Sequence, residues 1–284
     1  MVSAPPRAAA SLSPRLALAS IAWMASIAGC SLLTETDGLS GGSSGAVDAA
    51  ADAATDALSA TDAGATDAHD AESGATSCAA GELFCADFDE GAVEKGWDGL
   101  SSATGSITAD GETFVSPLRS AFVSIPTTPA YVQGIKLSKT MLGTFQTMRC
   151  SFAMYRGQIG TGDLTFAKLE VSTKDNNQIS LNLSTRPTEG DFSVRRYDAA
   201  TDTTIPKDVT APIAFPVGAW HTVVLEIDRS SARLFVDGTM NASVLHEESG
   251  EPTSALFMLG GIEIAKNDQP WKLRFDDVRC SRTQ

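Results

Sequence analysis

The chain has 284 residues, of which 43% are hydrophobic and 20% charged, and its formal net charge is −14 at pH 7. This length suits one or two domains, and the composition resembles an ordinary soluble protein rather than a fully disordered or collagen-like chain. The excess of acid disfavours a nucleic-acid binder, because phosphate contacts need clustered Lys and Arg.

The N-terminal segment is typical of a secretion signal. Arg7 and Arg15 make it positive, and the apolar run at 16–29 that follows ends in Ile-Ala-Gly before Cys30. That run is shorter than the roughly 20 residues of a bilayer span and matches the core of a signal peptide. Its end resembles the lipobox of bacterial lipoproteins, which implies that residues 1–29 are removed and that acyl chains on Cys30 anchor the protein to a membrane. A plain secreted protein with a chance cysteine is the alternative.

The residue after Cys30 bears on where the protein is sorted. It is Ser31 rather than Asp. By the same resemblance to lipoproteins, this favours the outer membrane of a bacterial cell envelope over the inner one. The expected localisation is therefore lipid-anchored, at the outer membrane.

Residues 30–77 are expected to form a disordered linker. After Cys30 they consist mainly of Ala, Asp, Thr, Ser and Gly, with nine acidic side chains and no Lys or Arg. Such a stretch has little to bury, and Asp48, Asp52 and Asp56 would repel one another on a single helix face. The G-x-S-x-G pattern at 38–42 is discarded as a hydrolase motif, because it needs a strand-to-helix turn.

From residue 78 onward, short segments of alternating polarity predict β-strands separated by turns. In QISLNLS (178–184), the apolar Ile and Leu side chains fall on one face and the polar side chains on the other. This period of two marks strands with one buried face. Many such strands with no long helical pattern indicate an all-β, antiparallel two-sheet sandwich over residues 78–284. The predicted strands are 83–88, 147–155, 164–172, 178–184, 191–197, 220–228, 232–238, 254–261 and 271–280.

Four segments of this region resemble the concanavalin A-like jelly roll, and especially its laminin-G-like members. They are GAWHTVV at 218–224, VDG at 236–238, a closing FDDV at 275–278 and an opening LFCADFD at 83–89. The resemblance implies a jelly roll over nearly all of residues 78–284, and this domain is expected to be monomeric. It says little about function, because this fold hosts lectins, adhesion modules, glycosidases and lyases.

Four cysteines follow the expected anchor, and an exported protein is expected to join them in disulfides. Three pairings are open, and the sequence alone does not choose among them. In related jelly rolls the strands that hold Cys150 and Cys280 run side by side. The resemblance therefore favours Cys78–Cys85 together with Cys150–Cys280.

No known catalytic pattern of this fold is complete in the chain. The glucanases of the family carry E-x-D-x-x-E, whereas Glu226-Ile227-Asp228 is followed by Ser231 in place of the last Glu. The R-x-E-x-R and Q-I-H motifs of the related lyases are also missing from the sequence. The sequence therefore predicts no enzyme, with a glycoside hydrolase or polysaccharide lyase as the alternative.

The predicted function is the binding of carbohydrate or another surface ligand, and a structural or protein-adhesion module is the alternative. In this fold a concave sheet usually holds the ligand. Hydrogen-bonding side chains beside an aromatic ring suit a sugar, which offers hydroxyls and an apolar face. Alternation places the candidate ligand-binding side chains outward on the middle strands: Lys168, Glu170, Asn182, Arg195 and Tyr197.

A structural calcium ion is a further expectation drawn from the resemblance; no other cofactor is expected. Glucanases of the fold hold Ca²⁺ between the first and last strands, and Asp87 and Asp276 align with those ligand positions. Ca²⁺ prefers carboxylate and carbonyl oxygens. The alternative is that these acids pair with Arg274 or Arg279.

Overall fold

The structure is a computed structural model that describes residues 78–101, 103–246 and 250–284. The predicted signal peptide, the acylation of Cys30 and the linker at 30–77 all lie outside the described residues. Within the described part, every regular element is a β-strand. None of the described segments forms a helix that could span a lipid bilayer.

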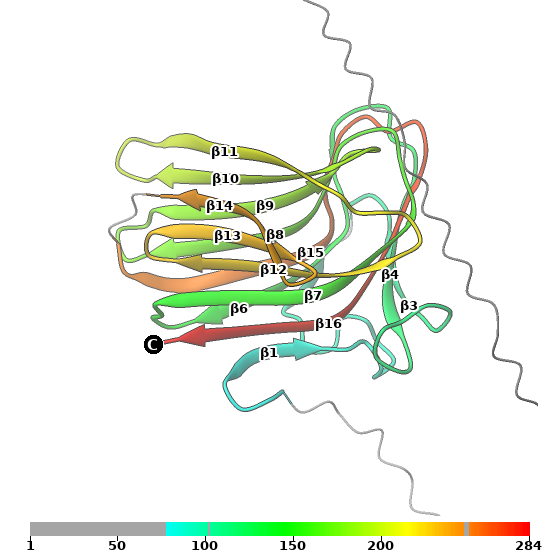
Figure 1. Ribbon diagram of the computed structural model, residues 1–284, viewed down its shortest axis with the longest axis horizontal. Coiled ribbons are helices and arrows are strands. Elements are labelled where there is room, and N and C mark those ends of the chain that lie inside the picture. Colours follow the sequence, from blue (N-terminus) through cyan, green and yellow to red (C-terminus); the bar gives the residue numbers. More distant parts are fainter. Residues whose placement is uncertain (1–77, 102, 247–249) are drawn as a thin grey trace, which may run out of the picture. The chain divides into compact units, whose positions relative to one another are not determined.

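The strands form two antiparallel sheets, and Figure 1 shows most of the labelled strands running side by side across the domain. Sheet A has the order β14-β13-β12-β7-β16-β4-β3, with β1 also paired to β16. Its strands are β1 (Glu82–Ala86), β3 (Ser106–Asp110), β4 (Ser120–Ile125), β7 (Thr147–Gln158), β12 (Trp220–Asp228), β13 (Ser231–Val236), β14 (Thr239–Leu245) and β16 (Trp271–Thr283).

Sheet B has the order β11-β10-β9-β8-β15-β6-β2, and β5 pairs with β15. Its strands are β2 (Gly99–Ser101), β5 (Val132–Gln133), β6 (Lys136–Leu142), β8 (Leu164–Thr173), β9 (Gln178–Thr185), β10 (Gly190–Asp198), β11 (Thr203–Ile213) and β15 (Pro252–Ile264). The predicted all-β, antiparallel two-sheet sandwich is confirmed.

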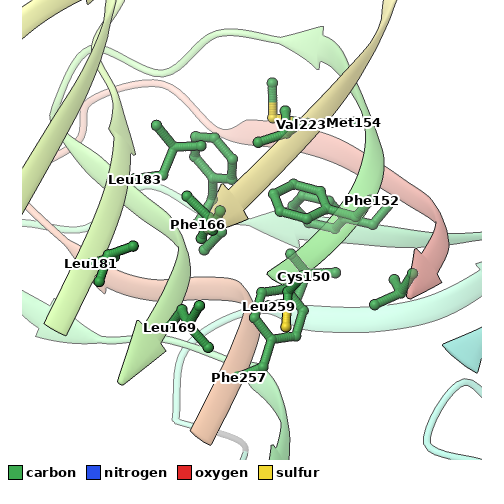
Figure 2. Close-up of a cluster of buried hydrophobic side chains, with 14 of the residues drawn as sticks. Cys150, Phe152, Met154, Phe166, Leu169, Leu181, Leu183, Val223, Phe257 and Leu259 are labelled. Carbon is green, nitrogen blue, oxygen red and sulfur yellow. The ribbon is translucent and has the colours of Figure 1, made fainter. Parts of the chain in front are cut away.

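The core lies between the two sheets and is built from the alternation visible in the sequence. On β9, Ile179, Leu181 and Leu183 are buried in the core, whereas Ser180 and Ser184 on the other face are partly exposed. Side chains of both sheets meet in this layer, and Phe152 of β7 packs against Phe257 of β15 with ring centroids 5.9 Å apart (Figure 2). Burial of this apolar surface is the main source of the domain's stability.

The V-D-G motif forms the tight turn that its sequence predicts. Asp237 and Gly238 both have positive φ, and the flanking residues Val236 and Thr239 pair directly. Two consecutive residues with positive φ form the turn whose twist matches a β-hairpin, and Gly adopts this conformation without strain. The Asp237 carboxylate accepts a hydrogen bond from the Thr222 N–H and lies 2.8 Å from His221 Nδ1, which ties the turn to β12.

Both disulfides have the pairing that the resemblance favoured. Cys78 is bonded to Cys85, and Cys150 is bonded to Cys280. Cys150 and Cys280 are direct partners on the neighbouring strands β7 and β16. The first bridge closes a short N-terminal loop, whereas the second joins central strands of sheet A.

Candidate functional site

The five predicted ligand-binding side chains come together on the outward face of sheet B. Lys168 and Glu170 lie on β8, Asn182 on β9, and Arg195 and Tyr197 on β10, and these three strands are neighbours. They line a hollow of about 230 Å³ together with Gln178, Ser180 and Thr204. Gln178, Ser180 and Thr204 belong to the same face, because each lies directly opposite a predicted residue on the neighbouring strand.

Hydrogen bonds fix the floor of this hollow. The Lys168 ammonium lies 2.9 Å from the Glu170 carboxylate. The Ser180 hydroxyl donates to Asn182 Oδ1 over 3.3 Å, and Asn182 Nδ2 donates to the Ser180 carbonyl over 3.4 Å. These contacts hold Asn182, which is largely buried, in one orientation, so the floor presents preorganised polar groups.

Tyr197 provides an aromatic ring at the side of the hollow. Its hydroxyl donates a 2.9 Å hydrogen bond to the Asp202 carboxylate. This hydrogen bond and the negative charge of Asp202 raise the pKa of Tyr197. The phenol therefore remains protonated at neutral pH, since its ordinary pKa is already about 10.

A second tyrosine, Tyr131, lies in the loop that leads into sheet B. Burial and the nearby Glu263 carboxylate raise the pKa of Tyr131, and the positive charge of Arg195 acts in the opposite direction. Tyr131 is 60% exposed and directly precedes β5, the short strand that pairs with β15. Sequence analysis missed Tyr131 and Glu263, because the outward faces that it considered belong to other strands. The signal available in the sequence was an aromatic residue, Tyr131, in a loop between predicted strands.

The acidic pair that sequence analysis compared with the glucanase motif lies on the opposite sheet. Glu226 and Asp228 are on β12 of sheet A, and the Arg233 guanidinium bridges them at 2.7 Å and 2.5 Å. Glu170 is the carboxylate that lines the hollow among the described residues, and it is paired with Lys168. The incomplete E-x-D pattern thus forms an ion-pair network on sheet A, remote in the fold from the hollow.

The two residues expected to bind calcium have other hydrogen-bond partners in the structure. Asp276 is fully buried, and its carboxylate accepts hydrogen bonds from the Val115, Ser116 and Asp277 N–H groups and from the Ser116 hydroxyl. Burial raises the pKa of Asp276 in spite of these bonds. Asp87 accepts a hydrogen bond from the Asp89 N–H. Asp276 thus fastens the segment before β4 to β16.

Calcium binding remains a prediction. Within the described ranges, one cluster of three potential His, Cys, Asp or Glu ligands occurs, at Cys78, Glu82 and Cys85, and its two cysteines form a disulfide. If Ca²⁺ bound Asp87 and Asp276, a chelator would lower the melting temperature of the protein. A melting temperature that is the same with and without chelator would contradict the prediction.

Comparison with known proteins identifies the family. The description "Concanavalin A-like lectin/glucanases superfamily" matches residues 133–283, more than half of the chain. The chain belongs to this superfamily. A sequence search of curated proteins found no match.

Solved structures show the same fold at low identity. The "Cellulose induced protein, Cip1" is 15% identical, with a TM-score of 0.52 over 70% of this chain and 97% of that one. LamA from Zobellia galactanivorans, in complex with laminaritriose and laminaritetraose, is 11% identical, with a TM-score of 0.45 over 71% of this chain and 98% of that one. The PL7 alginate lyase AlyA1 from the same organism is 8% identical, with a TM-score of 0.40 over 64% and 96% of the two chains. Identities this low show a shared fold alone.

These comparisons correct the prediction that the domain is not an enzyme. The description of the matching family names glucanases beside lectins, so the family to which the chain belongs includes enzymes as well as binding proteins. The prediction rested on motifs of particular enzyme groups, and the lack of those motifs does not separate binders from enzymes within so divergent a superfamily.

Proposed function

We propose that the outward face of sheet B binds a polysaccharide chain at the hollow lined by Lys168, Glu170, Asn182, Arg195 and Tyr197. The observation that carries this proposal is the geometry of the hollow, in which ordered polar side chains surround about 230 Å³ beside a tyrosine ring. Sugars offer the complementary surface, because their hydroxyls need hydrogen-bond partners and their ring faces pack on aromatic side chains.

The rest of the face extends the proposed site beyond the hollow. Tyr131 is exposed and directly precedes β5 of the same sheet, so it offers a second aromatic ring to a chain that extends beyond the hollow. Two tyrosines at one sheet suit a chain of several sugar units better than a small enclosed ligand.

Binding of the full chain to an array of polysaccharides tests the proposal. We expect binding of at least one polysaccharide, and a reduction of at least about tenfold when Tyr197→Ala or Asn182→Ala removes a ring or an ordered amide. A matched control is Tyr155→Ala, because Tyr155 is a partly exposed tyrosine on β7 of sheet A. An array without any bound polysaccharide, or equal loss in the control variant, would contradict the proposal.

The same samples can be assayed for new sugar chain ends. Release of chain ends by the wild-type protein would show that binding leads to cleavage. This measurement answers the question of catalysis separately from the question of binding.

A further inference from the structure

The charges that line the hollow are not balanced. Lys168 and Glu170 neutralise each other in a 2.9 Å ion pair on β8. Arg195 on β10 is the second cation that lines the hollow, and it is exposed. Within the part of the chain that the structure describes, no ion pair includes Arg195, so the lining of the hollow has one cation without an acidic partner.

The strands that flank Arg195 offer it no acidic partner. Arg195 is directly opposite Ser180 on β9 and opposite Pro206 on β11. The Ser180 hydroxyl is already bonded to Asn182, and Pro206 carries no polar side-chain group. The next residue, Arg196, pairs instead with Asp198. The cross-strand neighbours of Arg195 thus provide no acidic group to neutralise it.

An exposed guanidinium beside hydroxyl and amide groups is suited to an anion. Its planar fork of N–H donors matches a carboxylate or a sulfate group, and such charge-assisted hydrogen bonds are stronger than those between neutral groups. The carboxylate of Glu170 on β8 pairs with Lys168, and Ser180 of β9 lies between Glu170 and Arg195. The partner of Arg195 is therefore expected to come from outside the chain.

We propose that Arg195 binds an acidic sugar unit, so that the polysaccharide recognised at the hollow is polyanionic rather than neutral. This inference rests on the proposed function, and it adds the chemical class of the ligand. The acidic group is a carboxylate, as in a polyuronate, or a sulfate ester. Both present two oxygens to which the guanidinium can donate a pair of parallel hydrogen bonds.

Binding of the full chain to matched polymers tests this inference. The probes are alginate as a polyuronate, the same polymer with its carboxyl groups reduced to alcohols, a sulfated galactan and a neutral β-glucan. We expect alginate or the sulfated galactan to bind at least about tenfold more tightly than the neutral polymers, and added salt to weaken this binding.

Variants of Arg195 show whether this residue carries the preference. Arg195→Gln should reduce binding of the anionic polymer to that of the neutral one, whereas Arg195→Lys, which keeps the charge but not the fork, should retain part of it. Arg149→Gln on sheet A is the matched control and should bind as the wild type does, because Arg149 pairs with Glu226 on the other sheet. Unchanged melting temperatures would show that all three variants fold.

Each result separates this inference from the proposed function. Preference for alginate assigns the acidic group as a carboxylate, and preference for the sulfated galactan assigns it as a sulfate. Equal binding of the anionic and the neutral polymers, or undiminished binding of the preferred anionic polymer by Arg195→Gln, would overturn the inference while leaving polysaccharide binding intact. A protein that binds none of the four polymers would instead overturn the proposed function.

Discussion

Arg156 on β7 is a buried cation whose guanidinium is bonded to carbonyl groups rather than to acids. It is 2% exposed and donates to the carbonyls of Phe215, Arg186 and Pro187 over 2.5 to 3.3 Å. Burial lowers the pKa of Arg156, yet arginine remains charged in proteins. Through these bonds one side chain fastens β7 to the segments that follow β9 and β11.

Replacement of this arginine should destabilise the domain. Arg156→Ala leaves three carbonyls without a donor and creates a cavity, so we expect the free energy of unfolding to fall by about 3 kcal/mol. Arg149→Ala, an exposed arginine on the same strand, should change it by less than about 1 kcal/mol. Urea denaturation measures both, and equal effects of the two substitutions would show that burial does not decide the role of Arg156.

At the scale of elements, the hairpin of β12 and β13 depends on a carboxylate at its connection. Asp228 accepts hydrogen bonds from the N–H and hydroxyl groups of both Ser230 and Ser231, and it also contacts Arg233. Burial acts to raise the pKa of Asp228, but these hydrogen bonds outweigh it and the pKa lies below its usual value. The ionised carboxylate therefore stabilises this connection.

The pH dependence of stability follows from that direction. Because the pKa is lower in the folded state than in the unfolded state, the stabilisation is present above the unfolded pKa of about 3.9 and disappears as the pH falls through the folded pKa. Asp228→Asn should lower the free energy of unfolding by about 1–2 kcal/mol at pH 7 and by less near about pH 2.

The control for this prediction is Asp175→Asn in the exposed turn between β8 and β9. Thermal unfolding of the three proteins across acidic pH gives the comparison. A difference between wild type and Asp228→Asn that stays constant across the whole pH range would contradict the role given to ionised Asp228.

The strands that sequence analysis identified are those with strong alternation of buried and exposed side chains. The segment predicted at 220–228 coincides with β12, and the other predicted segments also fall on strands of the structure. The strands β2, β3, β4, β5, β6, β11 and β14 were not predicted. Three of them show why: β5 is too short for a pattern, β11 contains two prolines, and β14 is largely exposed at the edge of sheet A. Proline is tolerated in β11 because this strand is the edge of sheet B.

The candidate site could be predicted only in part, for a similar reason. Alternation placed Lys168, Asn182 and Arg195 on one face, and the register of β8, β9 and β10 aligns them. Tyr131 joins that face through a loop, and no local pattern encodes where a loop packs. The ion pair between Lys168 and Glu170, which leaves Arg195 uncompensated, also depends on side-chain geometry beyond the sequence pattern.

At the scale of the whole domain, the two disulfides are expected to contribute unequally. Cys150–Cys280 joins residues separated by 130 positions, whereas Cys78–Cys85 spans 7. By loop-closure entropy in the unfolded chain, the first should contribute about 5 kcal/mol and the second about 2 kcal/mol. Melting temperatures of the two double Cys→Ala variants check this order, and a greater loss from removing the short bridge would contradict it.

Anchoring by Cys30 is the prediction for the segment outside the described residues. In a bacterial host, the full chain should fractionate with membranes and carry a mass increase on Cys30, because buried acyl chains stabilise membrane attachment by about 0.8 kcal/mol per methylene. Cys30→Ala should move the protein to the soluble exported fraction. A wild-type protein without a lipid mass increase would contradict the prediction.

The position of β16 in sheet A has a consequence for the order in which the domain can be completed. β16 is the most C-terminal of the described strands, yet it lies between β7 and β4 and also pairs with β1. During synthesis, these three strands are made before β16, the strand with which all three pair. Their pairing with β16 is therefore expected to form late, because it joins segments distant in the sequence. A truncation before Trp271 would therefore remove the neighbour of three strands at once, together with the disulfide partner of Cys150.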